Sequence, residues 1–189
     1  MYILLKGGNM PIPRNWSEEL ITEWLSLKGY STEVGVHVGR GSRGSRKEAD
    51  VVGAKISLDD TDKRILNIFH IEVGQLGGYD KSIEMISEKF SDTRIDEIIR
   101  RYKDRMAFEG QIEYKKLYVD IWERPSLVKR LMNSTELASV GIEVWTPSEL
   151  FQNVFMEIKN WGEYTLPESY WMLKLLESLW EVGLITVHQ

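Results

Sequence analysis

The sequence contains no cysteine and no long apolar run, and its three histidines show no zinc-site spacing. Without cysteine the chain cannot form disulfides or thiolate metal sites, so a reducing cytoplasm is its expected setting. The apolar runs are far shorter than the roughly 18 residues that a membrane span needs, and the first residues lack the pattern of a signal peptide. We therefore expect a cytoplasmic protein with no membrane partner.

Positive charge is also in short supply, since the formal net charge is −5. This balance argues against a protein that wraps nucleic acid over its whole surface, although it leaves room for a local basic patch. The length of 189 residues and the 42% hydrophobic fraction fit one globular domain. We expect an N-terminal extension over 1–15, the main domain over 16–162 and a helical extension over 163–189.

The start of the chain has two interpretations. Residues 6–10 (KGGNM) could be the translation of a ribosome-binding site, which would make Met10 the natural first residue. The alternative is a short edge strand over residues 2–5.

Hydrophobic periodicity and turn residues predict alternating strands and helices. The predicted strands cover residues 30–38, 48–58, 64–73, 114–122 and 141–146. The predicted helices cover residues 16–28, 79–107 with a break near 91–92, 126–133, a segment starting at Ser148, and 167–182. The alternation in the second half favours an α/β fold with a mixed sheet. The last helix is apolar on more than one face, so it packs on the core or also supports a homodimer.

The second and third strands form a hairpin that predicts a site. If the turn centres on Thr61, Asp50 faces Glu72, and both side chains point to the same side of the sheet. Two opposed carboxylates repel each other unless a positive charge lies between them. Oxygen ligands of this kind suit Mg²⁺ or Mn²⁺, and Glu48, opposite Gly74, is a possible third carboxylate.

At this point the sequence resembles the PD-(D/E)XK nuclease superfamily, which has the restriction-endonuclease-like fold. The resemblance is carried by Glu18, Gly29-Tyr30, a glycine- and arginine-rich segment, Glu48-Ala-Asp50-Val-Val-Gly53 and Ile71-Glu72-Val73. It is greatest for the Mrr-like and archaeal Holliday-junction-resolvase branches. The resemblance implies a three-layer α/β/α fold around a central mixed sheet. It also implies a Mg²⁺-dependent DNA endonuclease, which we expect to be a homodimer, with metal ligands at Glu18, Asp50 and Glu72. Glu19 is the reserve for Glu18.

The sequence departs from the family pattern at one position. The family has a lysine two residues after the second acid, where this chain has Gly74. A lysine there orients water and stabilises charge in the transition state. Gln75 is the first candidate to replace it, Lys81 the second and Lys47 the third. The absence of this lysine leaves a second hypothesis open, namely a catalytically inactive member of the fold that binds DNA or assists assembly.

A glycine- and serine-rich basic segment, residues 39–47, leads into the strand that carries Asp50. It is predicted to be a loop that contacts the DNA phosphate backbone. Its basic residues are Arg40, Arg43, Arg46 and Lys47. His70 shares the face of Glu72, and we expect it to be a hydrogen-bonding strand residue rather than a metal ligand.

Overall fold

The computed structural model describes residues 16–40, 46–161 and 165–183. The strands are β1 (Ser31–Arg40), β2 (Arg46–Leu58), β3 (Arg64–Gly74), β4 (Gln111–Asp120) and β5 (Ile142–Trp145). The helices are α1 (Trp16–Leu27), α2 (Tyr79–Lys89), α3 (Asp92–Met106), α4 (Pro125–Met132), α5 (Thr135–Ser139), α6 (Pro147–Trp161) and α7 (Trp171–Glu181). Within these ranges, no helix is both long and apolar enough to cross a membrane.

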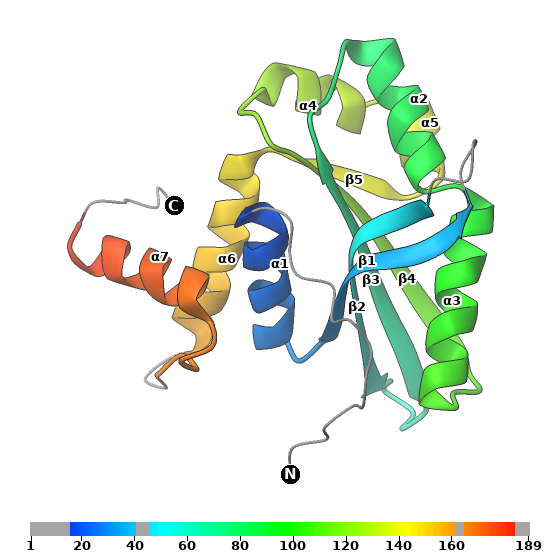
Figure 1. Cartoon of the computed structure of the whole chain (residues 1–189), viewed down its shortest axis with the longest axis horizontal. Coiled ribbons are helices and arrows are strands. Elements are labelled where there is room, and N and C mark those ends of the chain that lie inside the picture. Colours follow the sequence, from blue (N-terminus) through cyan, green and yellow to red (C-terminus); the bar gives the residue numbers. More distant parts are fainter. Residues whose placement is uncertain (1–15, 41–45, 162–164, 184–189) are drawn as a thin grey trace.

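The five strands form one mixed sheet in the order β1-β2-β3-β4-β5 (Figure 1). The first three strands run antiparallel, whereas β4 is parallel to β3 and β5 is parallel to β4. The carboxylate of Asp59 fixes the β2–β3 turn, because it accepts hydrogen bonds from the backbone N–H groups of Thr61 and Lys63. The predicted α/β class with a mixed sheet is confirmed.

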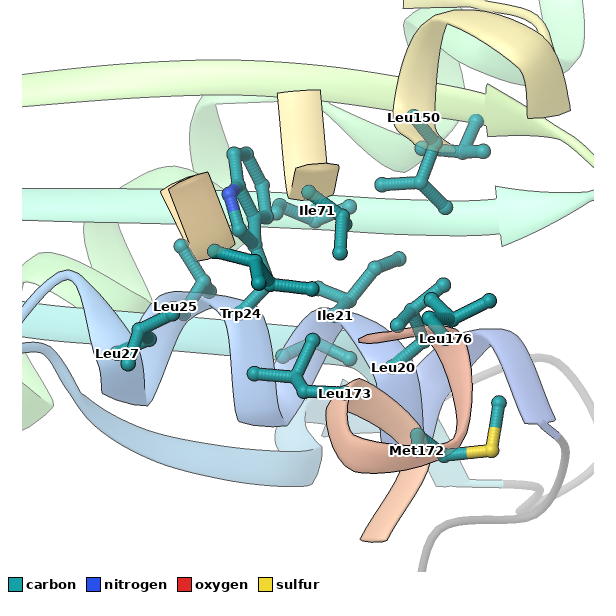
Figure 2. Packing of buried hydrophobic residues seen from close by; sticks show 14 of the residues in the cluster. Leu20, Ile21, Trp24, Leu25, Leu27, Ile71, Leu150, Met172, Leu173 and Leu176 are labelled. Atoms are coloured by element: carbon teal, nitrogen blue, oxygen red, sulfur yellow. The ribbon is translucent and has the colours of Figure 1, made fainter. Parts of the chain in front are cut away.

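One face of the sheet packs against α1. Odd-numbered residues of β3, such as Ile71, join the side chains of Leu20, Ile21 and Trp24 in a core that also includes α6 and α7 (Figure 2). Helix α7 packs on α1 through Met172, Leu173 and Leu176, as Figure 2 shows. The last helix therefore packs on the main core, which was the first of the two interpretations of its apolar faces.

The opposite face carries the even-numbered residues of β3. Leu66 and Ile68 pack against Ile98 and Tyr102 of α3. Tyr118, the β4 partner of Glu72, packs with α2, α4, α5 and β5 in a separate cluster. His70 contacts Phe90 of that cluster and Tyr114 beside the α3 cluster, so His70 and Glu72 lie where the two clusters meet.

The structure corrects the start of the last predicted helix and adds one short helix. The last helix begins at Trp171 rather than at Pro167, because residues 167–170 form a turn and the buried carboxylate of Glu23 accepts the N–H groups of Met172 and Leu173. This carboxylate satisfies N–H groups that the first turn of α7 leaves open. The short helix α5 was not predicted, whereas the break near residues 91–92 is confirmed. Residues 1–10, with both interpretations of the start, lie outside the described residues.

Candidate functional site

The β2–β3 hairpin has the predicted register. Its ladder runs from Leu58 opposite Arg64 to Val51 opposite Ile71, which leaves Asp50 and Glu72 as the next opposed residues. Asp50 Oδ2 accepts a hydrogen bond of 2.8 Å from the backbone N–H of Val73. Beyond the last ladder pair, the Asp50 carboxylate therefore accepts a backbone N–H group of β3. This hydrogen bond holds the Asp50 side chain beside Glu72.

The positive charge that such a pair requires comes from Lys89, in the last turn of α2. Its Nζ donates to Glu72 Oε2 at 2.5 Å and lies 3.8 Å from Asp50 Oδ2. The Glu72 side chain is fully buried, and those of Asp50 and Lys89 are 23% and 30% exposed. One ammonium group therefore bridges the two carboxylates at the edge of the core.

The second carboxylate oxygen of Glu72 is held from inside the protein. Glu72 Oε1 lies 2.8 Å from His70 Nε2, and His70 Nδ1 lies 3.0 Å from the Tyr114 hydroxyl. Burial lowers the pKa of His70 to about 3, so the ring is neutral at physiological pH. With Nε2 as the donor to Glu72 Oε1, Nδ1 accepts from the Tyr114 hydroxyl, and the two hydrogen bonds form one consistent network. His70 therefore orients Glu72, as its predicted structural role required.

Burial disfavours the charged form of both carboxylates. Burial, followed by the charge of Glu72, raises the pKa of Asp50 to about 6 despite the opposing effect of Lys89. Burial also raises the pKa of Glu72, again against the charge of Lys89. Acids with perturbed pKa values cluster at functional sites, so this pair is a candidate site.

Other cations surround the pair. Arg94 Nη1 of α3 lies 3.9 Å from Glu72 Oε1, and its Nη2 lies 3.9 Å from Glu88. The guanidinium is buried, and its Nε and Nη1 have no hydrogen-bond partner among the described residues. Lys47 of β2 forms an ion pair with the same Glu88, next to Lys89 in the chain. The site therefore combines three acids, namely Asp50, Glu72 and Glu88, with three nearby basic side chains of the kind that contact a phosphate.

The structure shows why no lysine occupies position 74. A Cβ atom on Gly74 would lie 2.6 Å from the Tyr118 hydroxyl oxygen, and Tyr118 is itself buried. Gln75 is exposed just beyond the end of β3, and Lys81 is exposed near the start of α2. Lys81 precedes Lys89 by eight residues, or about 12 Å of helix. The cation that reaches the acids is Lys89, which sequence reasoning missed.

We predict that Gly74→Ala destabilises the protein by about 1–3 kcal/mol, because the new methyl group collides with a buried hydroxyl. Tyr118→Phe removes that oxygen, so the double variant should recover most of the loss. Urea unfolding of the two single variants and the double variant measures the coupling.

The control for this cycle is Gly78→Ala. A Cβ there meets nothing within 4 Å, and Gly78 has an ordinary φ of −71°. Gly78 is the N-cap of α2, where glycine is preferred to alanine, so we expect a loss of no more than about 1 kcal/mol that does not depend on the Tyr118 hydroxyl. An equal loss for Gly74→Ala with and without the Tyr118 hydroxyl would contradict the steric explanation.

Glu18, the predicted third acid, is buried on α1, which packs on the face opposite that of Glu72. Its reserve Glu19 accepts a hydrogen bond from the Trp171 indole of α7. Over the described residues, no three His, Cys, Asp or Glu side chains form a group that could hold a metal ion. A Mg²⁺ ion at this site would therefore have two carboxylate ligands. Two suffice, because Mg²⁺ keeps several of its water ligands in proteins. A metal ligand role for Glu18 stays a prediction.

The basic segment is less loop-like than predicted. The β1–β2 ladder continues past an irregularity to Arg40 opposite Arg46, so Arg40 ends β1 while Arg46 and Lys47 begin β2. Arg43 lies outside the described residues. Lys47 is brought close to the acidic pair through its contact with Glu88. Glu48 pairs with His37 of β1, and its part in the site stays a prediction.

Comparison with known proteins adds no family to this description. No family model matches the chain, and neither the curated proteins nor the solved structures include a significant match.

Proposed function

We propose that this protein is a metal-dependent DNA endonuclease of the restriction-endonuclease-like, three-layer α/β/α fold, which hydrolyses phosphodiester bonds at Asp50 and Glu72. The observation that carries the proposal is the buried carboxylate pair bridged by Lys89. The order of the strands, with an antiparallel β1-β2-β3 meander and a parallel β4 reached through helices, supports it. So does the predicted register, which sets the two acids side by side.

In this proposal each residue has a separate role. Asp50 and the outer oxygen of Glu72 would hold Mg²⁺ or Mn²⁺, which supplies Lewis-acid chemistry to the phosphoryl group. His70 fixes the inner oxygen of Glu72 and so sets the direction of the outer one. Lys89 and Lys47 would neutralise phosphate charge. In the reaction, water attacks phosphorus and the bond from phosphorus to the leaving oxygen breaks, so that the DNA strand is cut.

A second candidate is a catalytically inactive protein of the same fold that binds DNA or assists assembly. It is favoured by the absence of a three-acid group among the described residues and by the ammonium that already lies between the two carboxylates. In its DNA-binding form the second candidate places DNA at the same surface, so it differs from the first only in cleavage. A homodimer stays a prediction in either case.

The test is incubation with plasmid, single-stranded and branched DNA in Mg²⁺ or Mn²⁺. We expect the wild-type protein to cut at least one of them and Asp50→Ala and Glu72→Ala to lose at least about a hundredfold in rate. The exposed Glu84→Ala on α2 is a matched control that should cut normally. Cleavage that survives both substitutions would refute the site, and binding without any cleavage by wild type would favour the inactive candidate.

A further inference from the structure

The contact between Lys89 and the acidic pair has a consequence for metal binding. The ammonium lies 2.5 Å from the Glu72 oxygen that points away from the core. A Mg²⁺ ion bound to that oxygen would lie about 2.1 Å from it. The two cations would occupy nearly the same position and would repel each other strongly. Occupation by Lys89 therefore excludes a divalent ion at Glu72 Oε2.

Lys89 is free to leave this position, whereas Glu72 is not. Lys89 is in the last turn of α2, its side chain is 30% exposed, and its ammonium is attached through a flexible four-carbon chain. Glu72 is fully buried, with its inner oxygen bonded to His70 and 3.9 Å from Arg94. If Lys89 departed, Glu72 would keep its direction and present a free oxygen to a cation.

We infer that Lys89 acts as an internal cation that exchanges with the divalent ion, and that its release presents the ammonium to a DNA phosphate. This inference rests on the proposed function and adds a regulatory step to it. In the absence of metal the Lys89 ammonium lies between the two carboxylates and offsets part of their charge, so that they do not face each other without a cation. The phosphate of the substrate then offers Lys89 a new negative partner, so that metal binding and DNA binding favour each other. Lys89 is a positioning residue for the metal-free state and a phosphate contact in the loaded state.

The test is calorimetric titration of the full chain with MnCl₂ alone, for wild type and for Lys89→Met. Methionine keeps the unbranched chain of lysine as far as Cε and removes the ammonium group. If Lys89 occupies the site for more than nine-tenths of the time, its loss should raise Mn²⁺ affinity at least about tenfold. Lys129→Met, at an exposed position on α4, should leave the affinity unchanged. Circular dichroism checks that each variant is folded.

A second measurement keeps the inference falsifiable with the native sequence. Acylation of lysines in the wild-type protein, followed by mass spectrometry, should show Lys89 reacting several-fold faster when Mn²⁺ is added. Lys129, exposed on α4, should react at the same rate in both conditions. Equal Mn²⁺ affinity of wild type and Lys89→Met, with no change in Lys89 reactivity, would overturn the exchange while leaving the metal site intact. No Mn²⁺ binding by either protein would overturn the proposed function as well.

Discussion

Asp50→Asn should make the metal-free protein more stable at neutral pH, by up to about 3 kcal/mol. Burial and the charge of Glu72 raise the pKa of Asp50 from 3.8 to about 6, which corresponds to about 3 kcal/mol against the ionised form. Asparagine removes this charge, and its side-chain oxygen can still accept the N–H of Val73. The gain measures the energy that the fold spends on keeping a carboxylate here.

The pH dependence gives the sign of the effect. The folded state binds the Asp50 proton more tightly than the unfolded state does. The free energy of unfolding of wild type should therefore fall as pH rises from 3.8 to about 6. Asparagine does not titrate, so the advantage of the variant should be absent below this window and complete above it. Urea unfolding in a metal chelator, at several pH values, measures the difference.

The exposed Asp60→Asn, in the β2–β3 turn, is the control and should change stability by less than about 0.5 kcal/mol. Added Mn²⁺ should narrow the gap between wild type and Asp50→Asn, because only wild type has the full ligand pair. An Asp50→Asn protein that is less stable than wild type at neutral pH would contradict the strained-carboxylate interpretation.

Glu72→Ala should have the opposite effect on stability, with a loss of about 3–5 kcal/mol. The substitution leaves the buried N–H of His70 without its acceptor, and it removes the anion that faces Lys89 and Arg94. Thermal unfolding of the metal-free variant measures the loss. Glu72 therefore supports the fold through its contacts, whereas Asp50 does not.

Glu72→Gln separates two contributions of Glu72 to stability, namely the hydrogen bond from His70 and the negative charge that faces Lys89. Its side-chain oxygen can still accept from His70, so it should lose less stability than Glu72→Ala while it also loses the charge that binds Lys89. This variant remains informative if Glu72→Ala fails to fold. A Glu72→Ala protein within about 1 kcal/mol of wild type would show that the network around His70 is not what holds this part of the sheet.

The hairpin could be predicted from the sequence because its information is local. Asp59 and Thr61 specify the turn, the turn specifies the register, and the register sets Asp50 beside Glu72. The predicted strands and the break near residues 91–92 depend on equally local patterns. These features follow from short-range turn chemistry and hydrophobic periodicity.

Lys89 could not be found in this way, because its position depends on tertiary packing. It is seventeen residues from Glu72 along the chain, and the packing of α2 against the sheet decides which lysine of that helix reaches the acids. The family pattern directed attention to position 74 and its neighbours, where the Tyr118 hydroxyl leaves no room for a side chain. The sequence did place Lys89 at the end of a helix, just before the predicted break. It could not show that the Lys89 side chain points toward the acids. The late start of α7 has a similar cause, because the Glu23 carboxylate that caps it comes from a distant helix.

The most direct test of the proposed site compares wild type with Asp50→Asn in two assays on the same preparations. One assay measures thermal unfolding in a chelator, and the other measures cleavage of a labelled DNA in Mn²⁺. We predict that the variant unfolds at a higher temperature than wild type and cuts at least about a hundredfold more slowly. Such a result cannot be attributed to unfolding. A variant that cuts as fast as wild type would show that Asp50 and Glu72 do not form a nuclease site.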